Sequence, residues 1–221
     1  MRPDRAATAR ADDERAYYAR SRHIYAAWFA TIYDAITWPA RWLRSRVARL
    51  AGIQAGMRAI DVATGTGAQA RAFADAGARV LAIDLSLRML AIAVRKRHHP
   101  DIDFVEADAT ALPAPDASFD VSCVSFALHE MPPGVRARVV AEMARVTRPG
   151  GTVVVVDYAL PRNRVWRWVV YHVVKTYEPA PYAGFVHADL VALLARSGIS
   201  LRADHRALLG AARVAIGIRE A

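Results

Sequence analysis

The stretch AIDVATGTGAQA at residues 59–70 constrains the fold of this chain more than any other. The apolar run that ends at Asp61 and Val62 suits a buried strand. Gly65 and Gly67 permit a positive φ angle and a close approach of the backbone to a ligand. The residues that follow can open a helix whose first amide groups face that ligand. The stretch therefore predicts a strand, a turn and a helix that together bind a nucleotide-like cofactor.

The glycines alone allow a second interpretation. Gly65, Gly67 and Ala70 also satisfy the relaxed dinucleotide fingerprint G-x-G-x-x-A, so an NAD(P)-dependent Rossmann reductase is an alternative. That fold would show a parallel last strand and a second half that repeats the glycine-rich turn. No second turn of this kind occurs in the sequence.

Further strand-like segments end in residues suited to a cofactor. Asp84 closes the run at 79–83, where a carboxylate can accept hydrogen bonds from both hydroxyls of a ribose. Asp108 and Ala109 follow the strand expected at 102–106 and offer an acceptor and a backbone donor to an adenine edge. These positions favour an adenine nucleoside as part of the ligand.

Alternating strands and helices predict an α/β fold with a doubly wound sheet. The remaining strands are expected at 119–126, 152–157, 201–208 and 213–218. The last two predict an antiparallel hairpin. Helices are expected at 87–98, after a possible Ser86 N-cap, and at 133–147, where the cluster RPGG at 148–151 stops the helix.

Four motifs taken together resemble class I S-adenosylmethionine (SAM) dependent methyltransferases. They are DVATGTG, IDLSLRML, ADATALPAPDASFD and EMARVTRPGG, and the resemblance covers the chain from Gly56 to Arg219. Within that superfamily the chain is most similar to the small-molecule group that includes ubiquinone and menaquinone C-methyltransferases. The resemblance implies a Rossmann-like, mostly parallel sheet of seven strands with an antiparallel last strand. It also implies SAM as cofactor and S-adenosylhomocysteine as product.

The resemblance carries cofactor contacts onto particular residues. It implies that the methionine part meets Asp61 and the turn after it, that Asp84 holds the ribose, and that Phe126 lies with Ala127 beside the transferable methyl group. The expected set is Asp61, Thr64, Gly65, Thr66, Gly67, Asp84, Leu85, Met89, Asp108, Ala109 and Phe126. The first motif departs from the family at Ala63 and Thr64, where a glycine or cysteine is common. We expect a small residue and a hydroxyl to be tolerated there.

Two aromatic segments flank the expected cofactor domain. Residues 1–50 predict an N-terminal helical cap or lid, residues 51–221 the SAM-binding domain, and residues 158–186 an insertion on the substrate side. Packing against the sheet is the competing explanation for both segments. The residues expected to meet the substrate are Tyr25, Tyr33, His129, Trp166 and Tyr171.

Methyl transfer gains chiefly from holding the acceptor close and in line with the methyl group. A phenol or an activated carbon also needs a base, and His129 at the exit of the fourth strand is the best-placed candidate. A structural histidine is the alternative. No His, Cys or carboxylate group has convincing metal-ligand spacing, so no metal is expected.

The net charge of +9 comes almost entirely from arginine, since Lys96 and Lys175 are the two lysines. A basic surface can attract nucleic acid, an anionic membrane or an acidic substrate, whereas a coding bias toward arginine would need no partner. Methylation of nucleic-acid bases is disfavoured, because Phe126 and Ala127 stand where base-modifying enzymes carry an Asn or Asp followed by Pro-Pro. The single cysteine, Cys123, suits a small buried apolar residue.

The arginine-rich N-terminus contains no apolar signal-peptide core, which predicts a cytoplasmic protein that can associate with an anionic membrane surface. The sequence as a whole favours a SAM-dependent methyltransferase acting on a small lipophilic or aromatic acceptor. A quinone-like molecule, a phospholipid and a natural product all fit that description. A SAM-binding protein without catalytic activity is the other alternative, and the oligomeric state is left open.

Overall fold

The computed structural model describes residues 5–23, 41–176, 178 and 181–221. Its centre is one sheet of seven strands in the order β3-β2-β1-β4-β5-β7-β6. The strands are β1 (Arg58–Val62), β2 (Arg79–Asp84), β3 (Ile102–Glu106), β4 (Phe119–Ser125), β5 (Thr147–Tyr158), β6 (Ile199–Ala207) and β7 (Ala212–Arg219). The first five are parallel to one another, whereas β7 is antiparallel to β5 and β6. The predicted α/β fold with a final antiparallel hairpin is confirmed.

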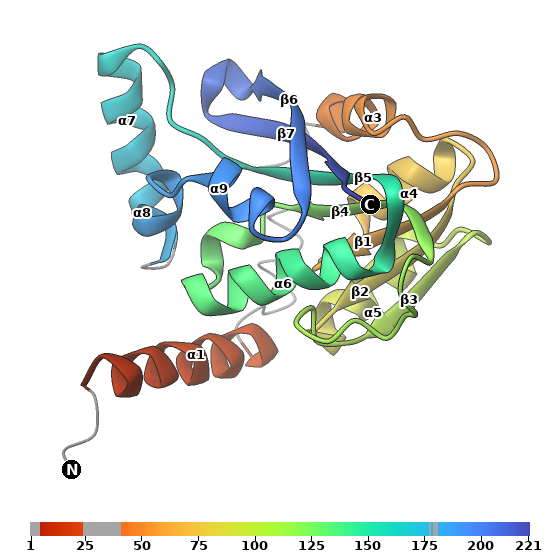
Figure 1. Cartoon of the computed structure of the whole chain (residues 1–221), viewed down its shortest axis with the longest axis horizontal. Coiled ribbons are helices and arrows are strands. Elements are labelled where there is room, and N and C mark those ends of the chain that lie inside the picture. Colours follow the sequence, from red (N-terminus) through yellow and green to blue (C-terminus); the bar gives the residue numbers. More distant parts are fainter. Residues whose placement is uncertain (1–4, 24–40, 177, 179–180) are drawn as a thin grey trace.

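Helices cover both faces of this sheet (Figure 1). They are α1 (Arg5–His23), α3 (Arg41–Leu50), α4 (Ala68–Asp75), α5 (Leu87–Arg97), α6 (Pro133–Val146), α7 (Arg164–Lys175), α8 (Pro181–Val186) and α9 (Leu190–Ala195). Two short 3-10 helices, η2 (Leu128–Glu130) and η3 (Leu208–Gly210), follow β4 and β6. None of the helices in the described ranges combines the length and the apolar character needed to cross a bilayer.

The core divides into two apolar clusters, one on each face of the sheet. In β1, Ile60 and Val62 join the cluster that contains the buried side of α6, whereas Ala59 joins the cluster that contains α3 and α4. This alternation follows from the two-residue period of a strand. Cys123 is fully buried in the second cluster, as predicted.

Two local predictions have different outcomes. Ser86 does cap α5, because its hydroxyl oxygen accepts a hydrogen bond from the Met89 amide at 3.4 Å. The prediction that residues 148–151 separate α6 from β5 is wrong, because β5 already begins at Thr147. The pairing of β4 with β5 shifts between Phe119 and Val121, so the RPGG residues form an irregular start of the strand. Gly150 makes this possible with a φ of 74°.

The N-terminal helix α1 lies against α6 (Figure 1). Glu14 forms an ion pair with Arg138 at 2.8 Å, and Tyr17 packs against the core cluster on that face. The Tyr18 hydroxyl lies 3.3 Å from the Thr110 hydroxyl, in the loop that follows β3. Helix α1 therefore reaches the edge of the sheet where the carboxyl ends of the parallel strands meet.

Candidate active site

The glycine-rich turn after β1 surrounds a buried carboxylate, Asp61. Its Oδ2 atom accepts hydrogen bonds from the Thr64 hydroxyl at 2.5 Å and from the Ala70 amide at 3.0 Å. Its Oδ1 atom has no hydrogen-bond partner among the described residues. Burial raises the pKa of Asp61 to about 7, although both hydrogen bonds oppose this change. A buried acceptor without a donor indicates a place for a hydrogen-bond donor of a ligand.

Asp84, at the end of β2, holds the same turn from the neighbouring strand. Its two carboxylate oxygens accept hydrogen bonds from the backbone amides of Gly65 and Ser86, each at 2.8 Å. Burial raises the pKa of Asp84 as well. Each oxygen of a carboxylate has two lone pairs, so Asp84 keeps acceptor capacity for a ligand while it fixes the turn.

The backbone at these strand ends adopts conformations that L-residues rarely occupy. Ala63 after β1 and Phe126 after β4 have φ angles of 55° and 52°. The two strands are neighbours at the point where the strand order reverses, which is where open α/β sheets bind ligands. A left-handed conformation at a non-glycine residue costs about 1 to 3 kcal/mol and is typical of functional sites. The strained backbone thus lies at the expected ligand position.

Gly67 shows why the second glycine of the turn is needed. It has a φ of 76° and precedes the first turn of α4. A Cβ atom built on Gly67 would lie 2.9 Å from the Phe104 ring, which is closer than real Cβ contacts. Any other residue would therefore meet both backbone strain and a steric clash.

The loop after β3 contains Asp108, a further residue predicted to contact the cofactor. Asp108 Oδ1 accepts hydrogen bonds from the amide and the hydroxyl of Thr110, both at 2.8 Å. The predicted cofactor residues therefore lie at or just after the carboxyl ends of β1, β2, β3 and β4, apart from Met89 in the first turn of α5. These four strands are consecutive neighbours in one parallel sheet. Thr64, Thr66 and Met89 among them are buried.

His129, in η2 after β4, is enclosed and held by two carboxylates. Its Nδ1 atom lies 2.7 Å from Asp157 Oδ1, and its Nε2 atom lies 3.0 Å from Glu178 Oε2. The backbone amide of His129 also donates to Asp157 Oδ2 at 3.2 Å. The side chain is only 2% exposed.

The two carboxylates decide the charge of His129. Burial by itself would lower its pKa, but the negative charge of Asp157, its hydrogen bond and then Glu178 outweigh burial and raise the pKa to about 10. The imidazole is therefore protonated at neutral pH and donates from both ring nitrogens. A protonated imidazole has no lone pair with which to accept a proton.

Aromatic rings connect this ion cluster to the expected methyl position. The Tyr158 hydroxyl donates to Glu178 Oε1 at 2.9 Å, and the Tyr158 ring lies edge-on to His129 with centroids 4.7 Å apart. The same ring contacts Phe126 at 5.5 Å. Tyr158 thus links Glu178 to Phe126, the residue expected beside the transferable methyl group.

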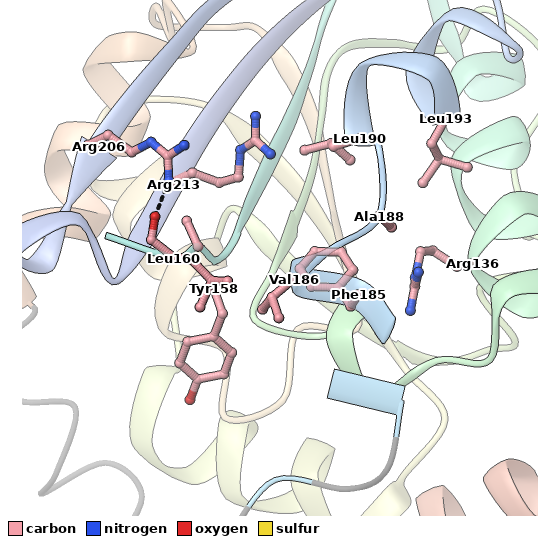
Figure 2. Close-up of a pocket in the computed structure, with 11 residues that line it drawn as sticks. Arg136, Tyr158, Leu160, Phe185, Val186, Ala188, Leu190, Leu193, Arg206 and Arg213 are labelled. Carbon is pink, nitrogen blue, oxygen red and sulfur yellow. Dashed lines mark hydrogen bonds between the residues drawn. The ribbon is translucent and has the colours of Figure 1, made fainter. Parts of the chain in front are cut away.

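A cavity of about 120 Å³ is lined in part by Tyr158 (Figure 2). Aliphatic and aromatic side chains line it together with three arginines, and polar atoms make up the larger part of its accessible wall. The lining residues are Arg136, Tyr158, Ala159, Leu160, Phe185, Val186, Ala188, Leu190, Leu193, Arg206 and Arg213. Because Tyr158 belongs both to this wall and to the His129 cluster, the cavity adjoins the candidate site.

The predicted substrate residues are only partly brought together. Tyr171 lies 6.2 Å from the Tyr182 ring, which in turn lies 6.4 Å from His129. Trp166 instead donates its indole N–H to the Leu209 carbonyl at 3.2 Å, on the outer side of α7. Tyr25 and Tyr33 lie outside the described residues.

Sequence reasoning missed Asp157, Tyr158 and Glu178. Asp157 carried a usable signal, because it follows the valine run of β5 near the carboxyl end of that strand, as Asp84 follows the apolar run of β2. Glu178 had no such signal. Sequence spacing also gave no hint that ligand atoms of His129, Glu130 and Glu178 lie within 4.8 Å of one another. A doubly hydrogen-bonded, protonated His129 is a poor metal ligand, so we assign no metal to this group.

The seven-stranded sheet with its antiparallel last strands has the fold of Rossmann-like methyltransferases. Residues 59–151 match the family model described as a methyltransferase domain, and this confirms the resemblance to SAM-dependent methyltransferases predicted from the sequence. The antiparallel β7 and the comparisons give the nicotinamide-dependent reductase no support.

Several curated proteins that the chain matches are named as quinone-related methyltransferases. The chain is 44% identical over 129 residues to the demethylmenaquinone methyltransferase of Renibacterium salmoninarum. The matched region covers 58% of this chain and 52% of that protein. It is 40% identical over 119 residues to the ubiquinone/menaquinone biosynthesis C-methyltransferase of Bdellovibrio bacteriovorus, covering 52% of this chain and 50% of the relative. The chain therefore spans about half the length of the curated relatives that it matches.

Solved structures share the fold at low sequence identity. A SAM-dependent methyltransferase from Aquifex aeolicus superposes with a TM-score of 0.64 and 19% identity, covering 80% of this chain and 89% of that one. The [4+2]-cyclase SpnF superposes with a TM-score of 0.65 and 21% identity over 82% of each chain. At this level of identity the two similarities concern the fold and not the reaction. One of the two proteins is in fact named as a cyclase.

Proposed function

We propose that this protein is a SAM-dependent methyltransferase that acts on a small lipophilic or aromatic acceptor. The observation that carries the proposal is the buried Oδ1 atom of Asp61, which finds no hydrogen-bond partner in the part of the chain that the structure describes. It lies at the point where the strand order reverses, close to Asp84 and the glycine-rich turn. The relatives named as demethylmenaquinone methyltransferases favour a quinone-like acceptor. A phospholipid or a natural product fits the same apolar surroundings.

The residues present fit SAM. Asp61 Oδ1 is a suitable acceptor for the ammonium group of the methionine part, because that cation would also compensate a buried carboxylate. Asp84 retains acceptor capacity for ribose hydroxyls, and Asp108 with Ala109 follows β3 where an adenine edge is expected. When bound, SAM supplies an activated methyl group on a sulfonium. The protein has to hold the acceptor in line with that group and exclude water.

We assign the proton-accepting role to Glu178 and make His129 its positioning residue. Protonated His129 holds the Glu178 carboxylate through Nε2 and is itself held by Asp157 through Nδ1. Tyr158 holds the other oxygen of Glu178. An acceptor proton released during methyl transfer would pass to this carboxylate, directly or through the Tyr158 hydroxyl. This assignment replaces a free imidazole base by a carboxylate with a fixed orientation.

We propose the predicted domain organisation with this function. Residues 1–50 act as a cap on a domain at 51–221, and residues 158–186 contribute the substrate side. The contact of Tyr18 with Thr110 supports a cap close to the cofactor. The contribution of Tyr158, Tyr182 and Glu178 to the His129 cluster supports a substrate-side role of 158–186. We further propose action in the cytoplasm, with an anionic membrane surface as a peripheral partner.

Methyl transfer from methyl-labelled SAM tests the proposal. The protein is incubated with labelled SAM and either a demethylated naphthoquinol, an aminophospholipid or a membrane extract, and labelled lipid is then measured after organic extraction. Label in the lipid fraction that disappears in Asp84→Ala supports a methyltransferase with a lipophilic acceptor. Tight binding of S-adenosylhomocysteine without transfer to any acceptor would favour the non-catalytic SAM-binding alternative.

A further inference from the structure

The outer face of α7 exposes an unusual amount of apolar surface. Val165, Trp168 and Val173 are 74%, 64% and 55% exposed, and helical geometry puts them on one side. The opposite side is buried, because Val170 and Val174 pack against Tyr182. Helix α7 lies at the edge of the molecule, away from the sheet (Figure 1). Packing therefore accounts for the apolar residues on the inner face of α7, but not for those on its outer face.

The turn between β6 and β7 extends this surface. Leu209 is 85% exposed and has a φ of 55°, and its carbonyl accepts the hydrogen bond from the Trp166 indole. We call this surface the α7 patch, which consists of Val165, Trp166, Trp168, Val173 and Leu209. Contiguous exposed apolar patches on soluble domains mark interaction sites.

The charged residues in α7 and directly before it are all basic. Arg162, Arg164, Arg167 and Lys175 lie in or directly before α7, and the stretch 161–176 contains no acidic residue. None of the four side chains forms an ion pair with a residue of the described ranges. Arg164 and Lys175 are exposed on one flank of the apolar face. The patch therefore combines exposed tryptophan and valine with basic side chains that have no acidic partner within the described ranges.

From this combination we infer that the α7 patch docks the protein on an anionic lipid surface. Tryptophan partitions into the polar–apolar boundary of a bilayer, and a helix with one apolar face and flanking basic residues lies in that boundary. Each lysine or arginine near an anionic surface adds further attraction. A protein partner would have to offer an equally apolar surface rimmed with acid, whereas an anionic bilayer has both properties everywhere.

The position of the patch gives the docking a purpose, which rests on the proposed function. The inner face of α7 packs on Tyr182, and the Tyr182 ring lies 5.5 Å from Tyr158 and 6.4 Å from His129. The α7 backbone, its inner valines and Tyr182 lie between the lipid-facing side of α7 and the candidate site. Docking through α7 would therefore hold the candidate site close to the bilayer in which a lipophilic acceptor dissolves.

Vesicle flotation of the full chain tests the docking. Binding is compared between phosphatidylcholine vesicles and vesicles that also contain phosphatidylglycerol, at low and at high salt. We expect binding to the anionic vesicles that weakens with salt. Trp168→Gln should reduce it about tenfold. The matched control is Trp42→Gln on α3, a tryptophan that is 50% exposed on another surface and should have no effect.

A second pair of variants tests the charges. The double substitution Arg164→Gln with Lys175→Gln should weaken binding to anionic vesicles about 25-fold, at roughly fivefold for each charge. The control removes two exposed charges from α5, Arg88→Gln with Arg95→Gln, and should weaken binding far less. If both double variants lost vesicle binding equally, net charge alone would account for the binding, and the assignment to α7 would be overturned.

Three outcomes would contradict the inference. Wild-type protein could fail to float with anionic vesicles, or Trp168→Gln could float as well as wild type. Wild-type protein could also form a dimer, without vesicle binding, that Trp168→Gln dissociates, which would make the patch an interface between two copies. Titration with S-adenosylhomocysteine tells a failure of the docking inference from a failure of the proposed function. Trp168→Gln should bind S-adenosylhomocysteine like wild type, whatever the vesicle experiment shows.

Discussion

Asp157 and His129 form a hydrogen-bonded ion pair across 2.7 Å, and both side chains are almost fully buried. The pair joins the end of β5 to η2 after β4. Glu178, which lies between α7 and α8, contacts the other ring nitrogen of His129 and adds a second carboxylate to the pair. A buried ion pair of this kind is a weak source of stability as a whole but is costly to break on one side. It therefore fixes the geometry of the candidate site.

Removing one carboxylate from this pair should destabilise the protein. We expect Asp157→Asn to lower the free energy of unfolding by about 2 to 4 kcal/mol, because protonated His129 loses its charged partner. Urea denaturation at pH 7 measures the change. Glu14→Gln is the control, since the Glu14–Arg138 pair is partly exposed and should contribute less than about 1 kcal/mol. A loss in Asp157→Asn no larger than in the control would contradict the ion pair.

The raised pKa of His129 predicts how stability changes in alkali. A pKa of about 10 in the folded protein, against 6.5 for an unperturbed histidine, means that the folded state binds the proton more tightly. The resulting stability is complete below pH 6.5 and is lost as the pH rises through about 10. Urea midpoints should therefore fall between pH 7 and pH 9.5 in wild type. His129→Gln should show a flatter profile, and parallel profiles would show that His129 is not the titrating group.

Asp61 predicts a pH dependence of cofactor binding. Its pKa of about 7 in the free protein should fall when an ammonium group pairs with Oδ1, so binding releases a proton. The affinity for S-adenosylhomocysteine should then drop about tenfold per pH unit below pH 7 and level off above it. Calorimetry between pH 5.5 and 8.5 measures this. Asp61→Asn should bind weakly with no such slope, and a slope that persists in this variant would point to another group.

The left-handed conformation of Ala63 predicts opposite effects for two small substitutions. Ala63→Gly should leave stability unchanged or raise it by up to about 1 kcal/mol, because relief of strain offsets the entropy of glycine in the unfolded chain. Ala76→Gly, at a φ of −89°, should instead lose about 0.5 to 1 kcal/mol. Thermal unfolding of both variants decides the matter. If Ala63→Gly lost as much as Ala76→Gly, the strain would be refuted.

Local patterns explain what the sequence could predict. The turn around Asp61 and Gly65 depends on residues close together in the chain, and Asp84 follows from a strand that the same pattern identifies. Neighbouring parallel strands then bring their ends together without further information. The antiparallel hairpin could be predicted because a short loop joins its two strands.

The His129 cluster could not be predicted because its members are distant in sequence. Asp157 and Glu178 lie 28 and 49 positions from His129, and tertiary packing alone brings them together. They raise the pKa of His129, which is the reason why we propose Glu178 rather than the imidazole as the proton acceptor. Likewise, the apolar character of α7 was visible in the sequence, but which of its side chains face outward depends on the packing of Val170 and Val174.

The cofactor claim is tested most directly by calorimetric titration of the purified full chain with S-adenosylhomocysteine, with NADH and NADPH run alongside. We predict micromolar binding of S-adenosylhomocysteine, no binding of either nicotinamide, and at least a hundredfold weaker binding in Asp84→Ala, since two hydrogen bonds to a charged group are lost. Binding of NADH or NADPH without S-adenosylhomocysteine would contradict the account, and so would an Asp84→Ala variant that binds S-adenosylhomocysteine as tightly as wild type.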